Sequence, residues 1–302
     1  MENDRKHDSE SIKIQHSVLY DLPRLIRRSS SGMLGFIIVA FVIFIAIFAD
    51  VLTPHKADAL NLIAIAKPPA WIAGGSSAHL LGTDMLGRDM LARILVGSRI
   101  SLMVGVFSVV VAGFIGTVLG ILSGYYGGLL DAVIMRISDS FHAIPQTLFA
   151  MVVLVVMGSG VFTLIFVIGI TTWVFYARMI RSEVLRIKSE EYIKAARTMG
   201  TSGFMIMVRH VLPNVTPSFI VVSTISVATS ILAEATLSFL GLGIQPPMVT
   251  WGVMLSDGRN YLTTSWWIAT FPGIAISLTV LGIMLLGNWL RDVLDPKNQG
   301  IQ

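Results

Sequence analysis

The sequence contains no cysteine, so disulfides, zinc–thiolate sites and thiol nucleophiles are all excluded. Charged residues are also scarce, because they make up only 13% of the 302 residues, whereas 54% are hydrophobic. Such a chain is too apolar for a soluble domain, and several of its apolar runs are long enough to cross a bilayer. The net charge of +4 comes from basic residues beside these runs. That distribution indicates a membrane protein and no nucleic-acid partner.

The chain also lacks the residues that the commonest chemistries need. It has no Gly-Lys-Ser/Thr sequence, so no P-loop can hold nucleotide phosphates. All six histidines lie outside the apolar runs, and none has a metal-site spacing. Ser159 lies between two glycines as some nucleophiles do, but no histidine in an apolar run could activate it. We therefore expect a non-catalytic chain with no cofactor and no metal of its own.

Six apolar runs predict an all-α integral membrane protein with six transmembrane helices. The predicted spans are approximately 33–52, 100–123, 144–157, 161–177, 215–233 and 266–289. One domain, residues 32–290, would lie between polar tails at 1–31 and 291–302. A polar stretch after the second span predicts a separate cytoplasmic helix at 131–142. Of the 22 Lys and Arg residues, 16 would share a side with the termini, which places both termini in the cytoplasm.

The end of the long polar loop before the second span carries closely spaced charges. Asp84 precedes Arg88 by four residues, and Asp89 precedes Arg93 by four, the favourable order for ion pairs on a helix. Thr83 or Asp84 could cap such a helix. The pattern predicts a short amphipathic helix at the outer interface, with a solvated face of self-paired charges.

Residues 191–213 form the longest polar interruption between apolar runs after residue 100. Ser189 is a candidate N-cap, Gly200 a helix stop, and 204–212 a second short helix before Pro213. The pattern predicts a helix–turn–helix on a membrane surface. A basic amphipathic segment lying on anionic lipid is the alternative interpretation.

This layout resembles the EAA loop of ABC-importer membrane subunits. Ala195 and Ala196 are followed by Gly200 at the family interval, and the pattern closes on Leu212 and Pro213. The sequence departs from the general pattern in two places. Glu191, followed by Tyr192, stands four positions before Ala195 instead of next to it, and His210 stands where an apolar residue is usual.

A second motif indicates which branch of the ABC-importer subunits the sequence resembles. Gly82, Thr83 and Asp84 are followed after two residues by Gly87, Arg88 and Asp89, a pattern similar to that of C-type permeases of dipeptide and oligopeptide importers. The blocks SFLGLGIQPP, WGVML and LRDVLDPK extend the similarity over nearly the whole chain. The resemblance implies the type I ABC importer permease fold.

The resemblance also implies partners and a mechanism. A homologous B-type permease would complete the channel, two P-loop ATPases would supply ATP and Mg²⁺, and an extracytoplasmic binding protein would deliver a peptide or related small solute. The chain would lie in a bacterial inner membrane. The helix near residues 191–200 would sit in a groove on one ATPase, with Glu191 pairing with a basic residue there.

Acidic residues are rare near the spans, so Glu234 is a candidate for the transport pathway. We expect it to line the path or a gate near Ser238 and Phe239, although an interfacial acid bonded to nearby backbone is an equal alternative. For the whole chain, a stand-alone six-span channel or secondary carrier is the alternative function. The sequence does not identify the cargo.

Overall fold

A computed structural model describes residues 29–294, so most of both predicted tails lies outside the described residues. Within this range the chain is helical, with loops and turns but no strand. The helices are α2 (Ser30–Leu52), α3 (Met90–Tyr126), α4 (Gly128–Ala143), α5 (Gln146–Met157), α6 (Val161–Lys188), α7 (Glu191–Thr198), α8 (Gly203–Ile206), α9 (Leu212–Phe239), α10 (Trp251–Gly258) and α11 (Trp267–Leu294).

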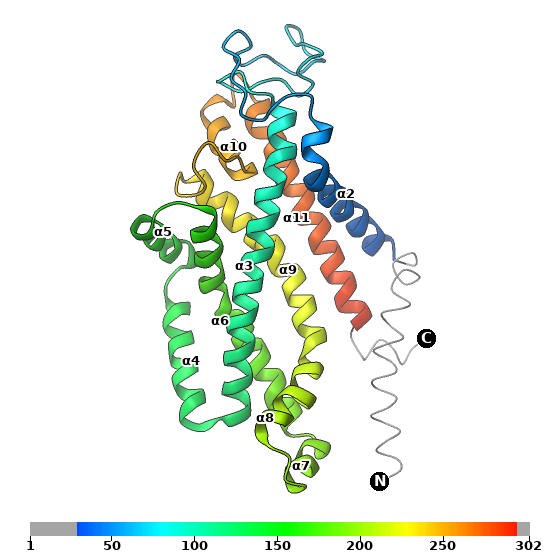
Figure 1. The fold of residues 1–302 in the computed structure, drawn as a ribbon, viewed down its shortest axis with the longest axis vertical. Helices are drawn as coiled ribbons and strands as arrows, with labels where there is room; N and C mark the ends of the chain where they lie inside the picture. Colours follow the sequence, from blue (N-terminus) through cyan, green and yellow to red (C-terminus); the bar gives the residue numbers. More distant parts are fainter. Residues whose placement is uncertain (1–28, 295–302) are drawn as a thin grey trace.

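Five helices of the described chain are long and apolar enough to cross a membrane, and α4 with α5 forms a sixth, broken candidate. Figure 1 shows α3, α6, α9 and α11 running along the long axis of the molecule, with α2 beside α11. The all-α prediction with six spans is therefore confirmed, with the third span broken.

The third span differs from the straight helix expected at 144–157. α5 has only 12 residues, about 18 Å, which is too short to cross a bilayer. It bends by 88° from α4 at Pro145, which has no N–H to continue a helix. α4 lies beside α6, and Arg181 Nε donates to Asp131 Oδ1 at 2.6 Å. The separate helix predicted at 131–142 is α4, and together with α5 it makes the broken candidate span.

Two other helices extend well beyond their predicted apolar runs. α3 begins at Met90, ten residues before the expected start, and α6 continues to Lys188. Two of the basic residues on the extension of α6, Arg178 and Arg181, have partners on α4, where Arg178 Nη2 donates to Asp139 Oδ1 at 2.8 Å. Hydropathy marks only the apolar part of such a helix. The charged turns before residue 100 were therefore predicted as a separate amphipathic helix, and the basic turns after residue 177 were left outside the span.

Glycines bring α3 and α6 into close contact. A Cβ on Gly116 would lie 2.4 Å from Tyr176 Cβ and 2.6 Å from the Trp173 carbonyl oxygen. At Gly120 it would lie 2.7 Å from the Ala177 carbonyl oxygen. Gly116 and Gly120, four residues apart, form a small-residue pair at the α3–α6 interface, where larger side chains would separate the helices.

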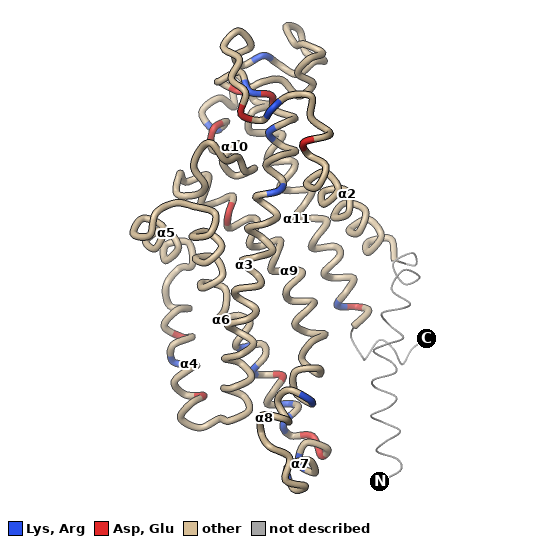
Figure 2. The backbone as a smooth tube through the Cα atoms, viewed as in Figure 1, with Lys and Arg blue, Asp and Glu red and all other residues tan. Residues whose placement is uncertain are grey.

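Charged residues gather at the two ends of the molecule and are sparse between them (Figure 2). One end holds α7 and α8, and we call it the α7 end. The other holds residues 53–89 and α10, and we call it the loop end (Figure 1). The candidate functional residues are divided between these two ends and the region where α9 meets α10.

Candidate functional site

The α7 end is built on a short helix that follows α6 almost directly. α7 begins at Glu191, with Glu190 as N-cap, and Glu191 lies in the first turn, where the helix dipole favours an acid. Ser189 is the C-cap of α6, and its hydroxyl donates to the Arg186 carbonyl at 2.6 Å. The predicted N-cap role of Ser189 is therefore wrong, because α6 is longer than its apolar run.

Gly200 ends α7, as predicted. Its φ of +80° is a conformation that residues with a Cβ rarely adopt. The Gly200 N–H donates to the Arg197 carbonyl at 3.0 Å, and the Thr201 N–H donates to the Ala196 carbonyl at 3.1 Å. These two bonds form a Schellman motif. No atom of the described chain would lie within 4 Å of a Cβ on Gly200, so this turn is open to a partner.

One face of α7 is fixed to the long helices. Ile193 and Ala196 are buried in a cluster with Ile187 of α6 and Tyr125 of α3. The Arg197 guanidinium lies 4.8 Å from the centre of the Tyr125 ring, a cation–π contact. α7 should therefore move together with α3 and α6. Ala196 faces its own chain, whereas Ala195 is exposed.

The other face of the α7 end exposes large apolar side chains. They include Met199 at 76% and Phe204 at 70% exposure. Smaller exposed fractions occur for Tyr192, Met205, Val208 and Leu212. Apolar side chains gathered at a polar, charged end of a chain are typical of a protein interaction surface. We call these six residues the apolar face of the α7 end.

The second predicted helix at 204–212 is not separate. α8 has four residues, and a π-helical turn, Met207–Val211, joins it to α9, so that Gly203–Phe239 forms one 37-residue helix. His210 lies in the turn, half-buried, with its ring 6.1 Å from that of Tyr192. Pro213 lies in the first turn of α9.

The amphipathic helix predicted at the loop end is only partly present: residues 82–89 fold as a loop, and the helix begins at Met90 as the first turns of α3. Gly82 and Gly87 have φ of +79° and +70°, and a Cβ on Gly87 would lie 1.9 Å from the Asn61 carbonyl oxygen. Asp89 caps α3, because its Oδ1 accepts from the Ala92 N–H at 2.8 Å. The expected caps, Thr83 and Asp84, are therefore wrong.

Asp84 is the centre of a buried ion-pair network. Its Oδ2 accepts from Arg88 Nε at 2.6 Å and from Arg93 Nη1. Arg93 Nη2 and Arg88 Nη2 donate to Asp257 of α10 at 3.1 and 3.3 Å. The predicted pair of Asp84 with Arg88 is confirmed, but Arg93 pairs with Asp84 instead of Asp89.

This network was expected on a solvated face, but the Asp84 and Arg93 side chains are only 2% and 3% exposed. It joins the motif loop, α3 and α10. A four-residue spacing brings opposite charges together only on a helix. Residues 84–89 are not helical, so the spacing did not predict the partners of Arg93.

Glu234 lies inside the chain, where α9 meets α10. It is 0% exposed, and its Oε1 accepts from Ser238 Oγ at 2.7 Å and Thr250 Oγ1 at 2.8 Å. Thr250 also caps α10 by accepting from the Val253 N–H at 3.2 Å. Phe239 is half-buried nearby on α9. The structure brings Glu234 and Ser238 together and adds Thr250, which the sequence did not single out; the pathway role stays a prediction.

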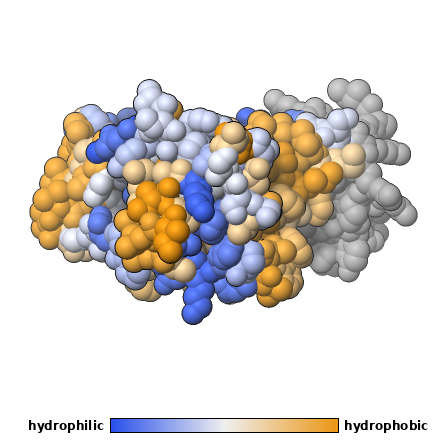
Figure 3. All heavy atoms as spheres, turned by 90° about the horizontal axis from the view of Figure 1, so that it is seen from above, coloured by the Kyte–Doolittle hydropathy of each residue, from blue (hydrophilic) through white to orange (hydrophobic). Residues whose placement is uncertain are grey.

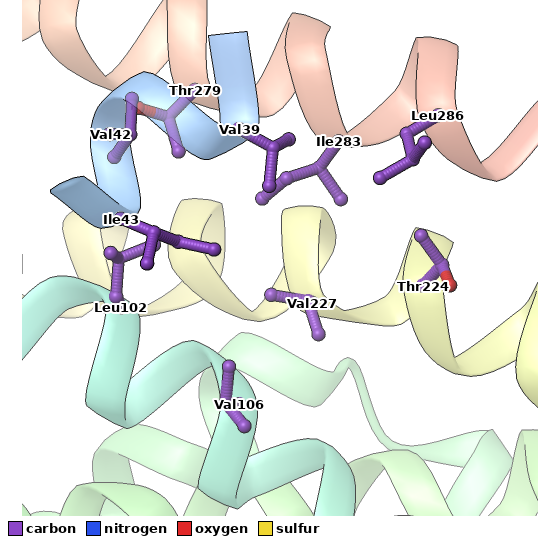
Figure 4. Close-up of a pocket in the computed structure, with 10 residues that line it drawn as sticks. All are labelled: Val39, Val42, Ile43, Leu102, Val106, Thr224, Val227, Thr279, Ile283 and Leu286. Atoms are coloured by element: carbon purple, nitrogen blue, oxygen red, sulfur yellow. The ribbon is translucent and has the colours of Figure 1, made fainter. Parts of the chain in front are cut away.

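Two cavities differ in chemistry. One, of about 610 Å³ at the loop end, has charged side chains of both signs, including Lys56, Asp58 and Arg93. The other, of about 250 Å³, lies between α2, α3, α9 and α11 and is lined by apolar side chains and two threonines (Figure 4). Figure 3 looks onto the loop end, where hydrophilic side chains gather near the middle. Only the first cavity has the charges that a polar solute or ion would need.

Comparison with known proteins supports the resemblance over nearly the whole chain. Residues 116–300 match the family described as binding-protein-dependent transport system inner membrane component, and residues 21–69 match the N-terminal transmembrane domain of oligopeptide transport permease C. The chain is 39% identical to the oligopeptide transport system permease protein OppC of Bacillus subtilis, covering 96% of this chain and 93% of that protein.

Two further relatives carry related names. The glutathione transport system permease protein GsiD of Pectobacterium atrosepticum is 44% identical, covering 86% of this chain and 84% of that protein. The dipeptide transport system permease protein DppC of Bacillus subtilis is 38% identical, covering 98% of this chain and 92% of that protein. The chain, with its broken third span and its six candidate spans in all, therefore belongs to the family of inner membrane components of binding-protein-dependent transport systems, the ABC transporter permeases.

Proposed function

We propose that this chain is a channel-forming subunit of an ATP-driven importer, and that α7 and α8 transmit closure of an ATPase to the transmembrane helices. The α7 end carries this proposal. Its inner face is fixed to α3 and α6 by Ile193 and Ala196, while its apolar face is exposed at the surface of the described chain. Because α7 is packed against α3 and α6, a partner that displaces α7 would move these long helices with it.

The proposed orientation puts the α7 end in the cytoplasm of a bacterial cell, with both termini on that side of the inner membrane. Most basic residues then lie inside, as the positive-inside rule requires. The chain has no P-loop of its own, so ATP and Mg²⁺ would be held by two separate ATPase subunits. A homologous B-type permease would complete the channel, and a binding protein would dock at the loop end.

In this mechanism ATPase closure moves α7, and the bundle rocks as a rigid body. Glu191 is exposed in the first turn of α7, where it can pair with a basic residue of the ATPase. The open turn at Gly200 allows the ATPase surface to approach closely. The Asp84 network would keep the loop end rigid during this motion, because it joins α3 to α10.

The proposed cargo is a peptide or a related small solute, since the relatives are named for oligopeptide, dipeptide and glutathione transport. Glu234, Ser238 and Phe239 are the proposed gate. In the described conformation Glu234 is enclosed, so the gate role requires α9 and α10 to separate during transport.

Polar substitutions on the apolar face test the coupling. Phe204→Ser combined with Met199→Ser should leave insertion unchanged, reduce uptake by at least tenfold and weaken ATPase co-purification. Leu129→Ser, at an 82% exposed residue in the first turn of α4, is the matched control. Wild-type uptake in the double variant would contradict the proposal. Uptake by the chain alone, without ATP, would instead indicate a stand-alone carrier.

A further inference from the structure

Three potential metal ligands meet at the loop end. His55, His79 and Asp89 each offer one ligand atom, and these atoms all lie within 4.8 Å of one another. The two imidazole rings lie at a centroid distance of 4.9 Å with their planes tilted by 35°, and His79 Nδ1 lies 2.8 Å from Asp89 Oδ2. The three residues come from separate turns of the loop, so their sequence spacing does not indicate the cluster.

The donor set suits a divalent transition ion. Imidazole nitrogen and carboxylate oxygen are common ligands of Zn²⁺. With tetrahedral bonds of about 2.0–2.1 Å, neighbouring ligand atoms would lie about 3.3 Å apart. The three ligand atoms now lie within 4.8 Å of one another, so ion binding requires the side chains to rotate and bring these atoms closer together. His79 and Asp89 are 9% and 4% exposed, so much of the site is already shielded from water.

The surroundings hold the ligands in place. Asp89 Oδ1 accepts from the Ala92 N–H at 2.8 Å, which fixes the carboxylate. His55 Nε2 lies 2.8 Å from the Ala78 carbonyl oxygen, so a proton on Nε2 leaves Nδ1 free to bind an ion. Such support from a backbone carbonyl is typical of histidine ligands.

The charged cavity of the loop end reaches this cluster. His55 is part of the lining of the 610 Å³ cavity, which therefore supplies an entry path and room for a water molecule as fourth ligand. The cluster thus has three ligands, hydrogen bonds that orient two of them, and access from solvent through the cavity.

We propose that His55, His79 and Asp89 bind one divalent transition ion of the zinc type. The ion ties the loop of residues 53–89, which leaves α2, to the head of α3, because Asp89 is the N-cap of α3. It replaces the present bond between His79 and Asp89 with two metal–ligand bonds. The site is independent of the proposed transport mechanism and does not require any partner chain.

Zinc titration of the purified full-length chain, carrying a tag without histidine, tests the site. One Zn²⁺ per chain should bind, and His55→Ala or His79→Ala should weaken binding at least a hundredfold. Asp89→Asn retains a residue able to cap α3 and should weaken binding at least tenfold. His142→Ala, at an exposed histidine of α4, should leave the affinity unchanged.

Trypsin supplies a second measurement. Lys56 is exposed beside His55, so Zn²⁺ should slow cleavage after Lys56 at least tenfold in the wild type and not in His55→Ala. Cleavage after the exposed Lys194 of α7 is the internal control. Equal zinc affinity in the wild type and both histidine variants would overturn the proposal. So would a rate of cleavage after Lys56 that is the same with and without Zn²⁺ in the wild type.

Discussion

Replacing Asp84 with asparagine tests how the loop end is held together. The Asp84 carboxylate accepts four hydrogen bonds: two from the backbone N–H groups of Leu86 and Arg88, one from Arg88 Nε and one from Arg93 Nη1. An asparagine side chain at this position would keep one oxygen for the backbone but would turn an amide towards the two guanidinium groups. Among the described residues, Arg93, with a side chain 3% exposed, would then keep an ion pair with Asp257 alone, whose side chain is 40% exposed.

Removing one partner of a buried ion pair destabilises a protein by about 3–5 kcal/mol. At about 2–4 °C per kcal/mol, the unfolding midpoint of Asp84→Asn should fall on the order of 10 °C. The control is Asp257→Asn, where the exposed carboxylate limits the loss to about 1 kcal/mol and a few degrees. Thermal unfolding in mild detergent measures both. Equal midpoints for the two variants would refute the view that Asp84 is the centre of the network.

The remaining predictions concern single positions. Gly116→Ala should prevent close packing of α3 on α6 and lower the unfolding midpoint, because the new Cβ would lie 2.6 Å from the Trp173 carbonyl oxygen. Gly97→Ala on the same helix is the control: its Cβ would have no neighbour closer than 3.5 Å, so it should be tolerated. Gly200→Ala should destabilise the end of α7 by about 1–2 kcal/mol through its positive φ, which hydrogen exchange would detect as roughly tenfold faster exchange of the last turn. Glu234→Gln keeps the oxygen that accepts from Ser238 and should fold normally but import its cargo more slowly; wild-type uptake of every substrate would exclude a gate role.

The sequence predicted well what depends on local chemistry. Apolar runs located the five long spans and the α5 half of the broken one, and Gly200 was identified as a helix stop, where the chain has a positive φ. The four-residue spacing of Gly116 and Gly120 is likewise a local pattern, typical of the close helix packing that they make in the structure.

What the sequence could not supply depends on tertiary contacts. The start of α3 was misplaced because buried partners, not local spacing, satisfy Asp84 and Arg93. Likewise, α6 was predicted too short because its basic end pairs with α4. The link of Glu234 to Thr250 joins residues 16 positions apart across a loop, and no periodic pattern marks it.

The central claim is that the α7 end joins this chain to an ATPase. The most direct measurement is a mild-detergent pull-down of the tagged chain from its native membrane, followed by mass spectrometry of the proteins recovered. We predict a second six-span permease and P-loop ATPases with the wild type, and loss of the ATPases alone from Phe204→Ser with Met199→Ser. Recovery of the chain alone, or unchanged ATPase recovery with the double variant, would contradict the claim.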